Sequence, residues 1–132
     1  MLKIFKGHIS VGKTFRTSPH IIWDLITDTT QWPRWGPTVK AVRASERYIK
    51  KASEGQILTA FGWLPFIITE YEHECFWNWK VASVRATGHR LESTDAGGVI
   101  LWFELPLIAF PYLAICQIAL NRIPDCVAKI KK

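Results

Sequence analysis

The run GVILWFELPLIAFPYLAICQIAL, residues 98–120, is the most apolar part of the chain, and its two strongly polar members are Glu104 and Gln117. Pro106 and Pro111 each lack a backbone donor. They divide the run into segments of about 8 and about 13 residues, both shorter than the roughly 20 residues that a membrane-spanning helix needs. The run therefore predicts a buried strand followed by a helix.

The spacing of apolar residues predicts that this last helix is amphipathic. The residues recur at alternating steps of four and three, which places them on one stripe of a helix. Pro124 falls inside the periodic run and should break or kink the helix at Ile123, so residues 125–132 are expected to form a redirected last turn. The stripe consists of Ala109, Leu113, Cys116, Leu120, Ile123, Val127 and Ile130.

The first part of the chain predicts one strand and two short helices. Residues 4–15 favour a strand, in which Gly7 and Gly12 allow a bulge or a tight bend. The dipeptide SP, residues 18–19, is typical of a helix start, with a hydroxyl at the N-cap and proline at the first helical position. The threonine-rich turn that follows is suited to capping a second short helix, which ends at the aromatic corner WPRWGP, residues 32–37.

The middle of the chain predicts strands joined by short links. Short links imply antiparallel neighbours, and the sheet must curve because one helix covers only part of it. The expected fold class is α+β: a curved antiparallel sheet of about seven strands wrapped around a carboxy-terminal helix, with two short helices after the first strand, in a single domain of residues 1–132. Besides the first strand, the expected strands are residues 39–47, 55–61, 66–72, 76–83, 84–92 and 99–105.

The composition indicates a globular chain that has more tryptophans than is usual for its length. Hydrophobic residues make up 48% and charged residues 21% of the 132 positions, which is ordinary for a folded domain and too apolar for disorder. Seven tryptophans are unusual at this length. Indole rings are bulky and carry an N–H that needs a partner, so some of them are expected to line a space that aliphatic side chains alone do not fill.

The charges and cysteines exclude several classes of site. The net charge is +6, but the basic residues fall in scattered groups, which favours a mildly basic, solvated surface over a nucleic-acid or anionic-membrane site. Three cysteines lie far apart without a Cys-x-x-Cys spacing, so neither a disulfide framework nor a zinc site is indicated. The start lacks the apolar run of a secretory signal. We expect a cytoplasmic protein without metal, cofactor, nucleic-acid partner or integral membrane association.

Several short motifs occur at defined positions within the predicted order of strands and helices. They are SP (18–19), WDL (23–25), Asp28, WPRWGP (32–37), Gly55, ITEY (68–71), WNWK (77–80) and ATGHR (86–90). With them the chain, to about Ile123, resembles the START-like or helix-grip superfamily, also called SRPBCC, and within it the bacterial polyketide cyclase/dehydrase-like group. The resemblance implies a deep apolar cavity between the concave face of the sheet and the carboxy-terminal helix. It does not by itself assign a function.

A set of polar residues in the last two expected strands is the strongest candidate for chemistry. In the register that pairs Glu92 with Val99, the set shares one side of the sheet, under the helix. A buried carboxylate near an imidazole or a guanidinium could orient a ligand carbonyl or shuttle a proton. The set consists of Arg85, Thr87, His89 and Glu104, with His89 opposite Trp102 and Thr87 opposite Glu104.

The alternative is a one-residue slip of this register. A slip turns the whole polar set outward and leaves the alternate residues of the last strand as the core face. The alternation Val-x-Leu-x-Phe-x-Leu favours the slip for that strand. Its core face would consist of Val99, Leu101, Phe103 and Leu105.

Aromatic residues are candidate walls of the implied cavity. Any single one is more often plain core, but seven together are harder to assign to packing alone. Trp77 and Trp79 share a face of their strand and are assigned to the concave side, because the opposite face carries the polar residues. The remaining candidate ligand-binding residues, besides the polar set and Trp102, are Trp35, Trp63, Phe66, Phe110, Tyr112, Leu113 and Cys116.

These features favour a binding protein that takes a small or medium hydrophobic molecule, such as a lipid, a polyketide-like or an aromatic compound, without catalysis. Two alternatives remain. One is a cyclase, dehydratase or hydrolase on the same fold, with His89 and Glu104 as an acid/base pair. The other is an interaction module, monomeric or homodimeric, whose contact surface is formed by the aromatic corner at residues 32–37 and the exposed tryptophans.

Overall fold

The computed structural model describes residues 1–130, except for the side chain of Phe110. In this part of the chain eight strands form one antiparallel sheet, in the order β1-β2-β8-β7-β6-β5-β4-β3. The strands are β1 (Leu2–Phe5), β2 (His8–Phe15), β3 (Ala41–Ala44), β4 (Glu54–Thr59), β5 (Gly62–Glu72), β6 (Phe76–Val81), β7 (Val84–Ser93) and β8 (Val99–Pro106).

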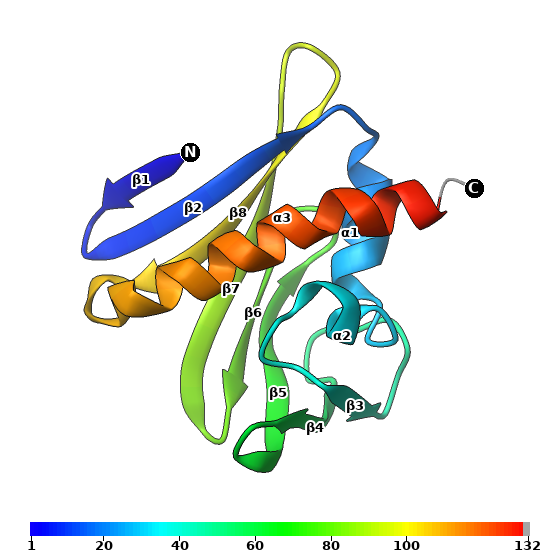
Figure 1. Cartoon of the computed structure of the whole chain (residues 1–132), viewed down its shortest axis with the longest axis vertical. Helices are drawn as coiled ribbons and strands as arrows, with labels where there is room; N and C mark the ends of the chain where they lie inside the picture. The colour runs from blue at the N-terminus through cyan, green and yellow to red at the C-terminus, as the bar shows by residue number, and fades with distance from the viewer. Residues whose placement is uncertain (131–132) are drawn as a thin grey trace.

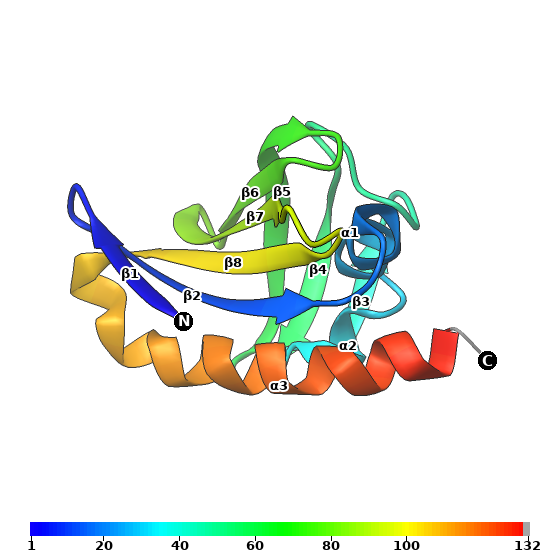
Figure 2. The ribbon, with the colours of Figure 1, turned by 90° about the horizontal axis from the view of Figure 1, so that it is seen from above.

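Helices occupy one side of this sheet and one of its ends. The long helix runs along the concave side (Figures 1 and 2), and the two short helices lie near its carboxy-terminal half. The predicted α+β class, with a single antiparallel sheet and a carboxy-terminal helix, is confirmed. The helical elements are α1 (Pro19–Thr27), α2 (Trp32–Trp35), the 3-10 segment η1 (Leu107–Tyr112) and α3 (Leu113–Ile130).

The eighth strand arises because the predicted first strand is a hairpin. Lys6 and Gly7 have φ angles of 48° and 77°, the left-handed pair that a tight hairpin turn requires. Gly12, in contrast, does not mark a bend: it pairs in regular register with Trp102. A Cβ at position 12 would lie 2.6 Å from the Trp102 ring, so this glycine makes room for an indole on the convex face.

Two irregularities bend the middle of the sheet. The pairing of β5 with β6 shifts register between Ile68 and Glu70, and that of β6 with β7 shifts between Asn78 and Lys80. Such bulges increase the local twist and bend the strands that carry them. The sheet therefore curves around α3, as Figure 2 shows.

The corner between α1 and α2 is held by a buried carboxylate. Asp28 accepts hydrogen bonds from the backbone N–H and the hydroxyl of Thr30. Arg47 donates to both carboxylate oxygens from its Nε and Nη2 atoms, and this contact raises the pKa of its guanidinium. The turn after α1 is thereby tied to the segment that precedes β4.

The predicted break of the last helix at Ile123 is wrong. α3 continues through Pro124 to Ile130. Beyond the proline, Cys126 and Val127 are buried, and burying one aliphatic side chain contributes about 1.5–3 kcal/mol. This packing offsets the cost of an internal proline, about 3 kcal/mol. Residues 131–132 of the predicted tail lie outside the described part of the chain.

Candidate ligand-binding site

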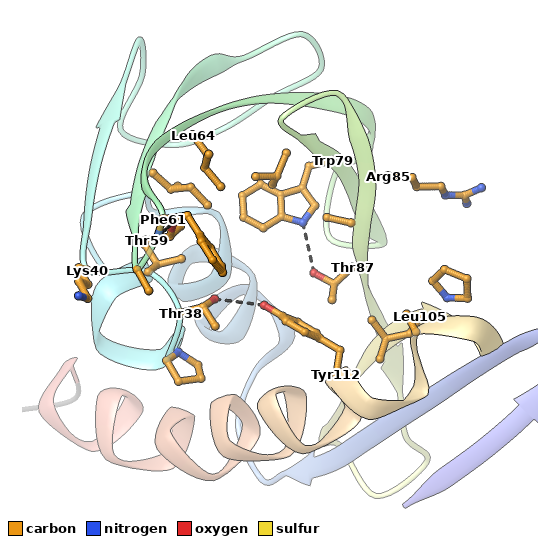
Figure 3. A pocket seen from close by; sticks show the side chains of 18 residues that line it. Thr38, Lys40, Thr59, Phe61, Leu64, Trp79, Arg85, Thr87, Leu105 and Tyr112 are labelled. Atoms are coloured by element: carbon orange, nitrogen blue, oxygen red, sulfur yellow. Dashed lines mark hydrogen bonds between the residues drawn. The ribbon is translucent and has the colours of Figure 1, made fainter.

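An open cavity of about 520 Å³ lies between the concave sheet face and the segment that follows α2. Strands β4 to β8 supply its apolar wall, and Tyr112 of η1 lies across from Trp79 (Figure 3). The volume is within the 300–1,000 Å³ typical of small-molecule sites. The aliphatic and indole side chains of its wall are Val39, Ile57, Leu64, Trp79, Val81 and Leu105.

Two pairs of polar groups interrupt this apolar wall. The indole Nε1–H of Trp79 donates to Thr87 Oγ1 at 3.2 Å. Thr38 Oγ1 and the Tyr112 hydroxyl share a hydrogen bond of 3.1 Å. Figure 3 shows the two pairs as dashed lines on different walls of the cavity. Each pair includes a hydroxyl that can also bond to a ligand.

A smaller cavity of about 50 Å³ shares Trp79, Thr87 and Tyr112 with the first and continues towards α3. Trp35, Trp77 and other core residues line it. Among the described residues, the buried Nε1 atoms of these two indoles have no hydrogen-bond acceptor. The volume is enough for a few water molecules, which could satisfy such donors.

His89 lies in the wall of the smaller cavity and is 2% exposed. Its ring stacks on Trp77 with the centroids 3.7 Å apart. Its Nδ1 is 3.3 Å from the Trp77 carbonyl oxygen, and its Nε2 is 3.4 Å from Thr87 Oγ1. A carbonyl only accepts, so Nδ1 carries the proton and Nε2 accepts from the threonine. Burial lowers the pKa of His89 to about 3, and the ring is neutral at pH 7.

The predicted register of the last hairpin is wrong by one residue. His89 pairs with Phe103, and Glu104 pairs with Gly88. Glu104 therefore lies on the convex face, where its Oε1 is 3.3 Å from Arg90 Nε. His89 and Glu104 do not form the predicted acid/base pair, because the sheet separates their side chains.

The alternative slip is right for β8 and wrong for β7. Val99, Leu101, Phe103 and Leu105 are all buried, as the alternation predicted. Thr87 and His89 nevertheless keep their concave position, because each strand's inward set is fixed by its own neighbours: Trp77 of β6 pairs with His89. Of the predicted polar set, Thr87 lines the main cavity and His89 the smaller one. Arg85 borders the main cavity, but past the bulge it pairs with Lys80, and its side chain points away from the cavity (Figure 3).

The other candidate wall residues divide between cavity, core and convex face. Trp77 and Trp79 lie on the concave side, and Cys116 of α3 lines the smaller cavity. Phe66 is buried against Trp32 and Trp79, and Leu113 is packed against the core. Trp63 lies under the guanidinium of Arg43, and Trp102 lies under Lys3 Nζ. The side chain of Phe110 is outside the described part of the structure.

The sequence reasoning missed the aliphatic half of the cavity. Ile57, Leu64, Val81 and Leu105 line it, together with Phe61 of the β4–β5 turn. Their signal was present, since inward positions alternate along each strand. A prediction based on aromatic walls alone left these smaller side chains out.

The aromatic corner is not the predicted contact surface. Trp32 and Trp35 are both buried. Trp32 donates from Nε1 to the Ile26 carbonyl at 2.8 Å and stacks on Trp77 at 5.5 Å. The corner is thus part of the core, where it closes one end of the sheet.

Within residues 1–130, no group of three or more His, Cys, Asp or Glu side chains is placed to hold a metal ion. The three cysteines are free thiols, and burial raises the pKa of Cys116 to about 12. None of the helices in the described chain has the length and apolar character needed to cross a membrane.

Comparisons with known proteins bear on the fold. No protein-family model matches the chain, and a search of curated proteins gives no match. Solved structures do match. The protein XoxI from Bacillus cereus superposes with a TM-score of 0.69 at 12% identity, over 96% of this chain and 99% of its own. Ara h 8.0201 gives 0.65 at 11% identity, over 92% and 97%.

A third structure, of the Aha1 dimer from Colwellia psychrerythraea, gives a TM-score of 0.61 at 14% identity, over 86% of this chain and 91% of its own. These likenesses are consistent with a START-like, helix-grip fold. At identities this low they establish the fold alone.

Proposed function

We propose that the chain binds a small or medium hydrophobic molecule, such as a lipid, a polyketide-like or an aromatic compound, without catalysing a reaction on it. The observation that carries the proposal is the open, apolar cavity of about 520 Å³ beside Trp79. Burying an alkyl chain there contributes about 0.8 kcal/mol for each CH₂ group removed from water.

The hydroxyl pairs support a role in orienting the ligand. Thr87 accepts from the Trp79 indole, and its own proton points to His89 Nε2 over a long 3.4 Å contact. A ligand carbonyl could compete for that proton. The Thr38 and Tyr112 hydroxyls offer a second donor and acceptor. A few polar groups in an apolar wall are the usual source of specificity in such sites.

Further parts of the proposal rest on the resemblance and the composition. We propose that residues 1–132 act as one START-like domain, related to the polyketide cyclase/dehydrase-like group. The domain would work in the cytoplasm as a monomer or homodimer, without a cofactor and without a nucleic-acid partner. The enzyme alternative has no acid/base pair of His89 and Glu104, because Glu104 lies on the convex face of the sheet.

The test is displacement of an environment-sensitive fluorescent fatty acid, together with native mass spectrometry and organic extraction of the purified protein. Leu64→Trp puts an indole into the cavity and should weaken probe binding at least about tenfold, the cost of a clash of about 1.4 kcal/mol. Ile67→Trp, on the same strand but the convex face, is the matched control. Absence of probe binding, with only the bare chain in the mass spectrum, would contradict the proposal.

A further inference from the structure

Three apolar side chains project into solvent around the mouth of the cavity. Phe61 of the β4–β5 turn is 90% exposed, Val84 at the start of β7 is 67% exposed, and Ile108 of η1 is 91% exposed. Each comes from a different segment, and each lines the cavity or adjoins a residue that does. In Figure 1 the two turns lie at the bottom of the molecule and η1 at its left.

The apolar surface continues from η1 onto the first hairpin. The Leu107 N–H donates to the Gly7 carbonyl at 2.8 Å, which joins η1 to the β1–β2 turn. Phe5, two residues before Gly7, is exposed, as is Leu107 itself. Water-exposed apolar groups that gather from several segments are typical of interaction sites rather than of ordinary surface.

The charge around the mouth has one sign. The segments 37–40, 59–62, 81–86 and 106–112 contain no Asp or Glu. They contain Lys40 and Arg85, which are both exposed; both border the cavity, on opposite sides, and their side chains point away from it into solvent (Figure 3). Neither takes part in any of the ion pairs of the described chain. The complementary surface is therefore anionic.

We propose that this mouth patch, defined as Lys40, Phe61, Val84, Arg85 and Ile108, docks on the surface of an anionic lipid bilayer. The three apolar tips enter the headgroup region, and the two cations face the anionic headgroups. Docked in this way, the cavity opens towards the bilayer, and a hydrophobic molecule enters or leaves without crossing water. Amphipathic surfaces with cations beside apolar side chains bind in this way.

A bilayer fits this patch better than a second copy of the chain. In a two-fold dimer the same patch meets itself, which would bring two sets of Lys40 and Arg85 together without an acidic partner. The three apolar side chains, Phe61, Val84 and Ile108, also come from separate segments. A fluid headgroup layer can accommodate them without a matching pocket, whereas a second protein surface would need one.

The test is sedimentation with vesicles of phosphatidylcholine alone and of phosphatidylcholine with about 30% phosphatidylglycerol, at about 0.1 M salt. The wild-type chain should bind the anionic vesicles, and high salt should release it. Val84→Ser with Ile108→Ser should weaken binding about twentyfold, and Arg85→Gln about fivefold. The matched controls are Ile130→Ser and Lys129→Gln, exposed at the other end of α3, which should bind as the wild type does.

Lack of wild-type binding to anionic vesicles would overturn the proposal, and so would equal losses in the controls. A concentration-dependent dimer that Val84→Ser with Ile108→Ser dissociates, without vesicle binding, would assign the patch to contact between copies. Probe binding without vesicles is measured on the Val84→Ser, Ile108→Ser double variant and should be unchanged, because Val84 and Ile108 do not line the cavity. Failure of the cavity proposal is thus distinguished from failure of membrane docking.

Discussion

Inward-facing residues of the sheet are tightly packed at one end of the molecule and border a cavity at the other. At the packed end, Trp32 of α2 stacks on Trp77, and Trp77 stacks on His89. At the hollow end, Leu64, Val81 and Leu105 face a cavity beside Trp79. The packed end is closed by α1 and α2, whereas Ala109 and Tyr112 of η1 and residues 37–40 lie across from the hollow end. Stacked indoles therefore stabilise one end of the sheet, whereas smaller side chains leave space for a cavity at the other.

The largest expected effect is the loss of the central ring of the packed end. Trp77→Ala should reduce the free energy of unfolding by about 4 kcal/mol, because the ring is fully buried between two others. Trp79→Ala should cost about 2 kcal/mol, because one side of that ring already borders a void. Urea denaturation measures both. Equal losses would contradict the distinction between the two ends.

A medium effect is expected from acid at the packed end. The pKa of His89 is about 3 when folded and about 6.5 when unfolded. The unfolded chain therefore binds more protons in this window, and stability falls as the pH falls below 6.5.

Between about pH 6.5 and pH 4.5 this histidine should remove about 2 kcal/mol from the free energy of unfolding. The measurement compares urea denaturation of the wild type and of His89→Phe, which keeps a ring against Trp77 but does not titrate. The wild type should lose more stability than the variant over this range. Parallel pH profiles would show that the imidazole is not held neutral by burial.

The smallest effect is expected at the hollow end. Leu64→Ala should cost about 1 kcal/mol, because the lost methyl groups already face the cavity rather than packed neighbours. Leu120→Ala, at a fully buried position of α3, should cost about 3 kcal/mol. Thermal and urea unfolding of the pair would check the ratio. A loss at Leu64 as large as that at Leu120 would mean that the cavity is closed in solution.

Local sequence patterns predicted the strands and helices. They failed for features that depend on packing between segments far apart in the sequence. The alternation of β8 predicted its buried face. Of the predicted helical stripe, Cys116, Leu120, Ile123 and Val127 are buried, whereas Ala109 lies in η1, Leu113 is partly buried and Ile130 is 48% exposed. The effect of Pro124 was misjudged because the packing of Cys126 and Val127 is a tertiary property.

The candidate site was predicted only in part, for a similar reason. The concave position of Thr87 and His89 depends on pairing with β6, and the convex position of Trp102 depends on the space above Gly12. Neither is visible in one strand's sequence. The cations of the mouth patch are far apart in the sequence and come to border one cavity only in the fold, which is why composition favoured an ordinary solvated surface.

The most direct test of the central claim is the indole N–H region of a ¹H–¹⁵N correlation spectrum during titration with a medium-chain fatty acid. The seven tryptophans report separately on packed and hollow regions. The account predicts that the Trp79 signal, whose Nε1–H bonds Thr87 in the cavity wall, shifts saturably while that of Trp32, bonded to the Ile26 carbonyl, stays in place. A titration in which no indole signal moves, or in which Trp32 moves as far as Trp79, would contradict it.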